Sequence, residues 1–185
     1  VIHTAFIHDL SRFKKVCEID RRAIAAMGAA LEGTDRPLIV TSGTGLLAGD
    51  GKASEDDLHR SGTDAIPRVA TEEAAAEIAK SGVRVAAMRL PPSVHGDGDH
   101  GFVPILIKLA REKGVSAYIG EGNNVWPAVH RLDAAALYRR ALESGVTAPR
   151  YHAVAEEGVP FREIAAVIGR RLGIPTVAKS PEEAA

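Results

Sequence analysis

The segment PLIVTS (37–42) decides the fold, because it is a short apolar run between Arg36 and Gly43. A run of this kind is typical of a strand that is covered on both faces of a sheet. Two strand-like runs flank it along the chain, VIHTAF (1–6) and VRVAAMRL (83–90). Together these runs predict neighbouring strands of one sheet.

Helical patterns fill the intervals between these runs. Apolar residues recur at helical spacing over 13–31, with Ser11 as N-cap and Gly33 as terminator. The segment after Pro67 carries acidic residues early and Lys80 late, an order that suits the helix dipole. Strand, helix, strand, helix, strand predicts an α/β fold whose parallel strands pair in chain order through right-handed crossovers.

The second half of the chain is less regular. PPSVHGDGDHG (91–101) is expected to be a loop, and SPEEAA (180–185) reads as a helix start with Ser180 as cap. Further helices are expected over 102–113, from the cap Asp133 to Ser144, and over 160–172, and short strands at SAYIG (116–120), VWPAVH (125–130) and YHAVAE (151–156).

Composition restricts the class of protein. The chain has 185 residues, of which 45% are hydrophobic and 25% charged, values that are ordinary for a globular protein with one core and a small lobe. A net charge of −1 with scattered Lys and Arg indicates no nucleic-acid partner, and no apolar run approaches the roughly 20 residues that cross a bilayer. Cys17 is the only cysteine, so a reducing cytoplasm is the expected setting.

The carboxyl ends of the predicted strands are where chemistry is expected, since open parallel sheets bind ligands there. These ends are 3–6, 41–44 and 91–98. Small and hydroxylated residues dominate the first two, as close approach of a nucleotide to the backbone requires. Each cluster alone is weak evidence for a ligand site, but the recurrence of such clusters after successive strands favours a nucleotide site.

The order of five motifs resembles the extended short-chain dehydrogenase/reductases, the NAD-dependent epimerase/dehydratase family. The motifs are VIHTAF (1–6), IVTSGTGLLAG (39–49), RLPPSVHGDG (89–98), GEGNNVWPAVHRLDAAALYRRAL (120–142) and YHAVAEEGVPFREIAAVIGRRLG (151–173). The resemblance implies a Rossmann-type doubly wound parallel sheet, NAD or NADP as cofactor, and a small-molecule substrate.

The resemblance also implies a division of the chain. Residues 1–98 would belong to the cofactor-binding domain and 99–185 mostly to a substrate-binding lobe, with a strand returning to the sheet near 151–155. In this family a strand like VIHTAF is the fourth. It is preceded by roughly seventy residues that hold the glycine-rich phosphate loop, and no such loop occurs in these residues.

Carried over position by position, the resemblance implies that Thr44 is the catalytic hydroxyl, which would hold a substrate carbonyl or alcohol for hydride transfer. The alternative is a loop threonine that satisfies local backbone. The residues expected to line the cofactor are His3, Thr4, Ala5, Thr41, Ser42, Pro91, Ser93 and Val94.

The family's Tyr-x-x-x-Lys motif is absent. Aligning PRVATEEAAAE (67–77) with it places Arg68 at the tyrosine and Glu72 at the lysine. Arginine stays protonated and is a poor proton donor, and a glutamate carries the wrong charge to replace lysine. We expect an exposed pair at i and i+4, stabilising by about 0.3–0.5 kcal/mol. The usual acid/base couple is therefore missing.

A substitute proton donor must come from elsewhere. His95 is the best-placed candidate, because it follows the strand on the nicotinamide side, although a solvated loop histidine is the alternative. Tyr118 and His130 are further candidates and are expected to face the substrate. Trp126 stands where nucleotide-sugar members often carry an arginine, which favours a smaller or more apolar substrate; an indole that fills the core is the alternative.

HGDGDHG (95–101) groups histidines and aspartates but lacks the spacing of a zinc or EF-hand site, so no metal is expected. Two functions stay open. One is an NAD(P)-dependent oxidoreductase or epimerase-like enzyme that uses Thr44 and a nonstandard proton donor. The other is a cofactor-binding sensor or scaffold that lost the chemistry. A homodimer is compatible with both.

Overall fold

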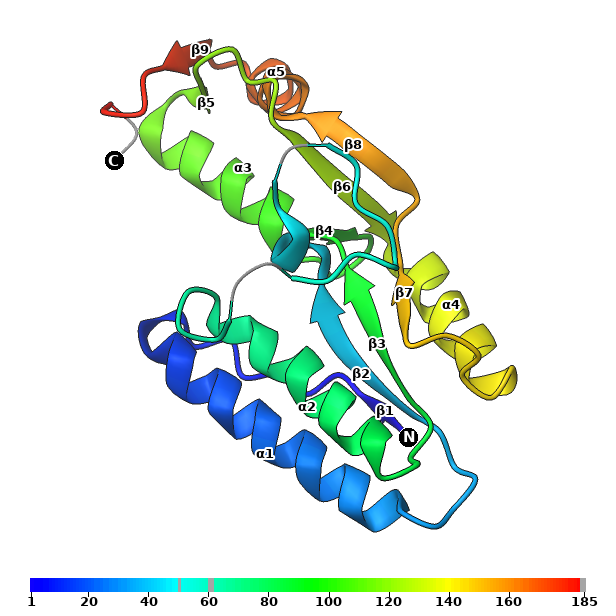
Figure 1. The fold of residues 1–185 in the computed structure, drawn as a ribbon. Helices are drawn as coiled ribbons and strands as arrows, with labels where there is room; N and C mark the ends of the chain where they lie inside the picture. The colour runs from blue at the N-terminus through cyan, green and yellow to red at the C-terminus, as the bar shows by residue number, and fades with distance from the viewer. Residues whose placement is uncertain (50, 60–61, 184–185) are drawn as a thin grey trace. The chain divides into compact units, whose positions relative to one another are not determined.

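The structure, a computed structural model, describes residues 1–49, 51–59 and 62–183. The chain forms two compact units (Figure 1). The first unit consists of Val1–Leu90 and Asp133–Ala153, and the second of Pro91–Leu132 and Val154–Ala185. The α/β class expected from the sequence is confirmed.

The first unit is built on a parallel sheet. Its strands are β1 (Ile2–His3), β2 (Leu38–Gly43), β3 (Val85–Leu90) and β7 (Arg150–His152), in that order across the sheet. All three pairings are parallel. The predicted pairing of the first three strands in chain order is therefore confirmed, and a fourth strand returns from the second half of the chain.

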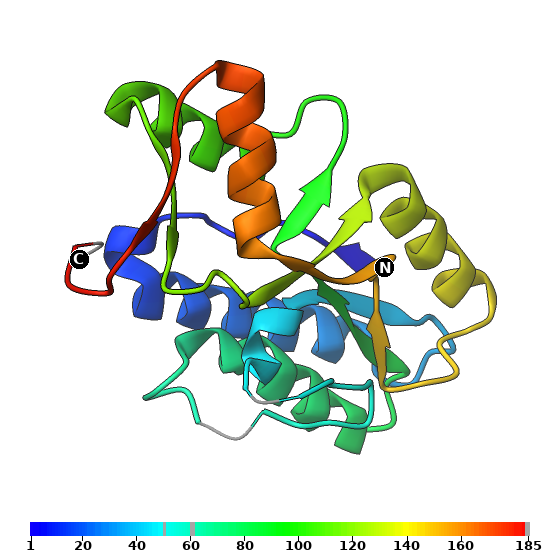
Figure 2. The ribbon, with the colours of Figure 1, turned by 90° about the horizontal axis from the view of Figure 1, so that it is seen from above.

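Helices cover both faces of this sheet (Figure 2). Helices α1 (Phe13–Leu31) and α2 (Ala70–Lys80) lie on one face, and α4 (Arg131–Glu143) lies on the other. The strands alternate accordingly: Val40 packs among residues of α1 and α2, whereas the next residue, Thr41, meets Tyr138 of α4. The described residues of the unit also form short 3₁₀ helices: η1 (Leu10–Arg12), η2 (Thr44–Leu47) and η3 (Pro67–Val69).

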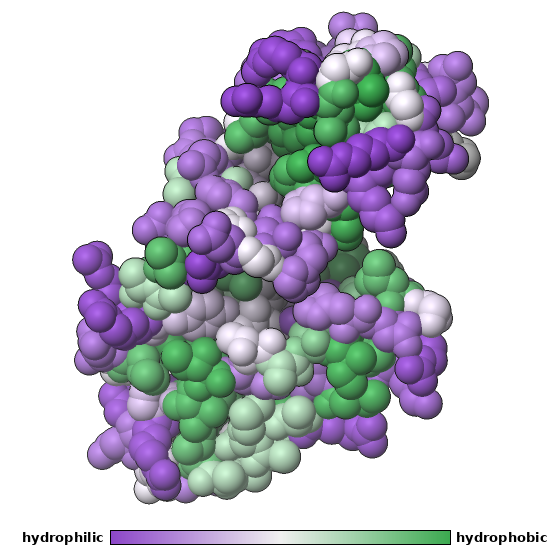
Figure 3. All heavy atoms as spheres, turned by 180° about the vertical axis from the view of Figure 1, so that it is seen from behind, coloured by the Kyte–Doolittle hydropathy of each residue, from purple (hydrophilic) through white to green (hydrophobic). Residues whose placement is uncertain are grey.

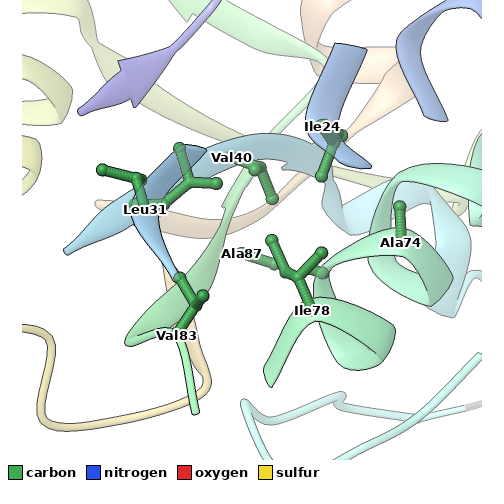
Figure 4. Close-up of a cluster of buried hydrophobic side chains, with 9 residues drawn as sticks. Ile24, Leu31, Val40, Ala74, Ile78, Val83 and Ala87 are labelled. Carbon is green, nitrogen blue, oxygen red and sulfur yellow. The ribbon is translucent and has the colours of Figure 1, made fainter. Parts of the chain in front are cut away.

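The core of the first unit lies between the two helices and the sheet. Figure 4 shows Ile24 of α1 and Ile78 of α2 converging on Val40 and Ala87 of the strands. The helices cross closely because residue 28 is glycine: a Cβ there would lie 2.5 Å from the Ile78 side chain. Cys17, also on α1, is buried with only 1% of its surface exposed.

The second unit contains, within its described residues, two small sheets and two helices. Strands β4 (Ser93–His95) and β6 (Val125–His130) pair in parallel, and β8 (Glu156–Pro160) joins β6 in the antiparallel direction. Strands β5 (Ser116–Ile119) and β9 (Thr176–Lys179) form a parallel pair. The helices are α3 (Phe102–Lys113) and α5 (Phe161–Leu172); each ends at a glycine in the left-handed conformation, Gly114 and Gly173.

Several local predictions for the second half were wrong. The expected loop 91–101 contains β4, which forms because β6 offers it a ladder of backbone partners. Strands β8 and β9 were not expected, since Gly158 and Pro160 interrupt the pattern of the first and the second has only 4 residues. Helix α4 begins at Arg131, so Asp133 stands in its first turn and is not its cap.

The segment expected to start a helix at 180–185 is only partly described. Ser180 and Glu183 exchange hydrogen bonds at 2.9 and 3.3 Å, as in a capping box, but residues 181–183 form a turn, and 184–185 lie outside the described residues. Among the described helices, none has the length and apolar character needed to cross a membrane.

Candidate active site

Thr44 lies directly after β2, at the carboxyl edge of the first unit's sheet. It is half-buried, and its hydroxyl contacts the carbonyl of Leu90 at 3.5 Å, the outer limit for a hydrogen bond. Leu90 is the last residue of β3 and pairs with Gly43, so the two strand ends meet beside Thr44. A hydroxyl engaged so weakly can bind another group.

Glu72 of α2 is the centre of a buried network at the same edge of the sheet, on the face that α1 and α2 cover. Its carboxylate accepts hydrogen bonds from the Ser42 hydroxyl at 2.7 Å and from Nε and Nη2 of Arg89 at 2.8 and 2.7 Å. The Arg89 side chain is fully buried. Burial would raise the pKa of Glu72, but the hydrogen bonds from Arg89 and Ser42 together lower it. The carboxylate is therefore held in its ionised form.

Arg89 also holds part of the long polar segment between β2 and α2. Its Nη1 donates to the carbonyl of Asp57 at 2.9 Å and contacts Nε2 of His152 at 3.2 Å. Arginine has only donors, so Nε2 of His152 accepts and the imidazole is neutral; burial lowers the pKa of His152. Nearby, Glu55 accepts from the backbone N–H of His152 at 3.2 Å, and its carbonyl accepts from Arg150 at 2.6 Å. These contacts attach 55–57 to β3 and β7.

A second network surrounds Asp20 of α1. One carboxylate oxygen lies 2.8 Å from Nε2 of His3, and the other accepts from Thr71 at 2.5 Å and from Nη1 of Arg68 at 2.7 Å. Burial opposes ionisation, but the hydrogen bonds from Thr71 and His3 and the charge of Arg68 lower the pKa of Asp20. Nη2 of Arg68 donates to the Thr41 carbonyl at 2.8 Å, and its guanidinium lies 3.8 Å from the centre of the Phe6 ring.

The expectation of an exposed Arg68–Glu72 pair is therefore wrong. Each side chain turns toward the sheet and finds its partner on another element, Asp20 on α1 for Arg68 and Arg89 on β3 for Glu72. Arg68 of η3 and Glu72 of α2 are thereby joined to charges that are distant in sequence. Both side chains are fixed by charge-assisted hydrogen bonds, so neither is free to move a proton.

The residues expected at the cofactor divide into two groups. In the first unit, Thr4 and Ala5 are exposed. Thr41 donates to the carbonyl of His3 at 2.8 Å and lies 2.6 Å from the hydroxyl of Tyr138, and Ser42 is occupied by Glu72. The hydroxyls of Thr41 and Ser42 are thus used within the protein. The remaining expected cofactor residues, Pro91, Ser93 and Val94, belong to the second unit, where Pro91 and Ser93 are buried.

His95 and His130 lie side by side in the second unit. They are register partners on β4 and β6, and their ring centres are 5.4 Å apart in an edge-to-face arrangement. Nδ1 of His130 accepts from the backbone N–H of Leu132 at 3.3 Å, so a neutral His130 carries its proton on Nε2. Within the described part of the chain, no group of three or more potential ligands is placed to hold a metal ion.

Trp126 packs in an aromatic cluster of the second unit. Its ring stacks on Phe102 with 4.6 Å between centres and lies 6.3 Å from Phe161. The indole Nε1 is buried without a hydrogen-bond partner among the described residues. The ring packs against these side chains, and its N–H is free to donate to another group.

Tyr118 lines a pocket of about 500 Å³ in the second unit, with Phe161 and Ile168 on its apolar wall and Lys113 and Lys179 among its lining residues. In Figure 3, hydrophobic side chains reach the surface at the top of the view, in the part formed by this unit, with hydrophilic ones around them. The exposed apolar residues of the unit include Ile105, Leu109 and Ile119.

Sequence reasoning missed Asp20, Arg89 and His152. One signal was available: Arg89 lies inside the apolar run VRVAAMRL, and a charge inside a buried strand needs a buried partner. Asp20 gave a weaker signal, since it lies on the buried side of α1 together with Cys17 and Ile24. The partners themselves come from other elements and carry no local pattern.

No family model matches the chain. It is 53% identical over 184 residues to an uncharacterised protein of Schizosaccharomyces pombe, covering 100% of this chain and 62% of that protein. It is 46% identical over 187 residues to an uncharacterised protein of Saccharomyces cerevisiae, with 100% and 61% covered. The chain thus spans about three fifths of the length of these relatives.

Solved structures of dehydratases and epimerases share the fold. A dTDP-glucose 4,6-dehydratase from Streptomyces venezuelae, solved with NAD, matches with a TM-score of 0.77 at 17% identity, covering 97% of this chain and 60% of that one. A nucleoside-diphosphate sugar epimerase from Corynebacterium glutamicum matches with a TM-score of 0.71 at 19% identity, covering 98% and 41%. The resemblance drawn from the motifs is confirmed at the level of the fold: the chain has the Rossmann-type fold of the NAD-dependent epimerases and dehydratases.

Proposed function

We propose that the whole protein is an NAD(P)-dependent oxidoreductase or epimerase/dehydratase-like enzyme that acts on a carbonyl or alcohol of a small molecule. The observation that carries this proposal is the position of Thr44. Its weakly engaged hydroxyl stands at the carboxyl edge of a parallel sheet, where such folds bind their ligands. A hydroxyl there can hold the substrate oxygen while hydride is transferred.

The residues present fit a dinucleotide. Thr4 and Ala5 follow β1, are exposed and carry small side chains, so they leave room for a cofactor to approach the backbone. Pro91, Ser93 and Val94 would border the nicotinamide, as the family resemblance implies. When bound, the cofactor supplies or accepts the hydride. The solved dehydratase with the same fold contains NAD, which supports this cofactor class; the choice between NAD and NADP stays open.

The proton donor that we propose differs from the tyrosine that the family resemblance implies. Arg68 keeps its proton and is tied to Asp20, and the Glu72 carboxylate is ionised against Arg89. We retain His95 as the candidate donor, with His130 beside it in the correct tautomer to donate from Nε2. Trp126 and Tyr118 would contact the substrate. An indole at position 126, where the family resemblance implies an arginine in nucleotide-sugar enzymes, favours a substrate that is smaller or more apolar.

A cofactor-binding sensor or scaffold is the second candidate. Arg68 and Glu72, which stand at the two positions of the Tyr-x-x-x-Lys motif, both form buried ion pairs. This favours the second candidate, because a protein that kept the fold but lost catalysis would not need these positions for proton transfer. A cytoplasmic location and a homodimer are predictions that both candidates share.

Titration of the whole protein with NADH and with NADPH, followed by cofactor fluorescence, tests the shared part of the proposal. We expect saturable binding of one or both. A panel of small aldehydes, ketones and alcohols is then assayed for cofactor oxidation or reduction. Turnover with any member supports the enzyme; tight cofactor binding without turnover supports the sensor; and absence of binding would reject both.

A further inference from the structure

We propose that Glu72 is a positioning residue: through Arg89 it fixes the carboxyl ends of β2 and β3 and holds the segment 55–57 beside them. The part of this inference that concerns Thr44 rests on the proposed function. The part that concerns the segment 55–57 rests only on the contacts of Glu72 and Arg89.

The Glu72 carboxylate joins β2 and β3 through two residues that lie opposite each other in the sheet. Ser42 and Arg89 are register partners in β2 and β3, and both donate to Glu72. The next pair along the strands is Gly43 and Leu90, and the residue after Gly43 is Thr44, whose hydroxyl contacts the Leu90 carbonyl. A movement of either strand end would therefore displace Thr44 relative to that carbonyl.

The same pair determines where the chain goes after Thr44. With Nε and Nη2 occupied by Glu72, the guanidinium is oriented so that Nη1 reaches the carbonyl of Asp57 and Nε2 of His152. Arginine presents its donors in a rigid fork, so fixing one edge fixes the direction of the other. Glu72 thus acts on the segment 55–57 through Arg89.

The geometry also explains why a carboxylate stands where the family has lysine. A lysine at this position would place its ammonium beside the fully buried Arg89 guanidinium, and two unpaired cations cannot share a buried site.

The test compares three variants of the whole protein. Arg89→Lys keeps a cation beside Glu72, but a single ammonium cannot also reach the Asp57 carbonyl. The charge-swapped double variant Glu72→Arg/Arg89→Glu keeps an ion pair but places a carboxylate at the Asp57 carbonyl, where it repels. Glu77→Gln is the control, since Glu77 lies on the same helix in an exposed pair with Lys80.

Hydrogen exchange of peptides within 51–59, followed by mass spectrometry, is the first readout. In Arg89→Lys and in the swapped variant we expect exchange to accelerate by roughly 10–100-fold, the effect of losing one charge-assisted hydrogen bond. The control should match the wild type. Thermal unfolding, measured in parallel, shows that each variant is folded.

Turnover is the second readout. Misplacement of Thr44 should lower kcat by about 10–100-fold with a smaller change in KM. If the swapped variant recovers both slow exchange and wild-type kcat, the pair serves stability alone and the inference is overturned. If the wild type turns over no substrate, the proposed function fails on that result, while the exchange data still decide whether Glu72 and Arg89 position the segment.

Discussion

Replacing Asp20 with alanine is expected to destabilise the first unit by about 3–5 kcal/mol, the range for removing one partner of a buried ion pair. Asp20 is buried and has side-chain partners in His3, Arg68 and Thr71. Without it, the largely buried Arg68 guanidinium loses its counter-charge, and the Thr71 hydroxyl loses its acceptor. Equilibrium unfolding in urea, followed by circular dichroism, measures the change in the free energy of unfolding.

Glu18→Ala is the matched control, because Glu18 lies about half a turn away on the same helix, is mostly exposed and pairs with the nearby Arg21. It should change the free energy of unfolding by less than about 1 kcal/mol. If Asp20→Ala behaves like Glu18→Ala, the network around Asp20 does not stabilise the fold.

The contribution of Asp20 to the free energy of unfolding should also depend on pH. Because the pKa of Asp20 is lowered from 3.8 in the folded protein, its contribution is present above that value and is lost as the pH falls through the folded pKa. The difference in unfolding free energy between wild type and Asp20→Ala should therefore be fully developed at neutral pH. It should shrink in acid, below pH 3.8.

Thr44→Val is expected to lower turnover by about 10–1000-fold, the range for removing one hydrogen bond that is used in the transition state. Valine has nearly the shape of threonine, and within the protein the Thr44 hydroxyl makes only a weak hydrogen bond, at 3.5 Å, to the Leu90 carbonyl. Stability and cofactor affinity should therefore change little. Steady-state kinetics on the best substrate of the carbonyl and alcohol panel, together with NAD(P)H titration, measure turnover and cofactor affinity.

Thr176→Val provides the control for Thr44→Val. The Thr176 hydroxyl makes the same kind of hydrogen bond, 3.5 Å from the carbonyl of Ala165, but it lies in the second unit on β9. Thr44→Ser should retain most of the turnover, since it keeps the hydroxyl. Equal turnover in Thr44→Val and wild type would remove Thr44 from the catalytic site.

The sheet of the first unit could be predicted because its strands have a clear local pattern. PLIVTS and VRVAAMRL are nearly unbroken apolar runs, as strands covered on both faces must be, and the helices between them carry clear ends. Parallel pairing in chain order then follows from the length of the crossovers. Strands β4, β8 and β9 could not be found in the same way, because partner strands, and not their own residues, make them extended.

For the candidate site, the sequence predicts the location in the fold but not the partners of its charged side chains. Thr44 could be located from its position after β2, but the roles of Arg68 and Glu72 depend on Asp20 and Arg89, which lie 48 and 17 residues away in the chain. An i, i+4 spacing says which helical residues are neighbours, not whether they face water. Burial of that face, decided by packing against the sheet, turned an expected surface pair into two separate internal networks.

The burial of Cys17 has a practical consequence. The thiol is the only one in this chain, it lies inside the packed face of α1, and burial raises its pKa, so it is a poor nucleophile while the helix is in place. An alkylating reagent can then react only in the moments when α1 has come away from the sheet. At high reagent concentration, the rate of alkylation therefore equals the rate at which this layer opens. Mass spectra taken over time measure that rate under native conditions, without denaturant.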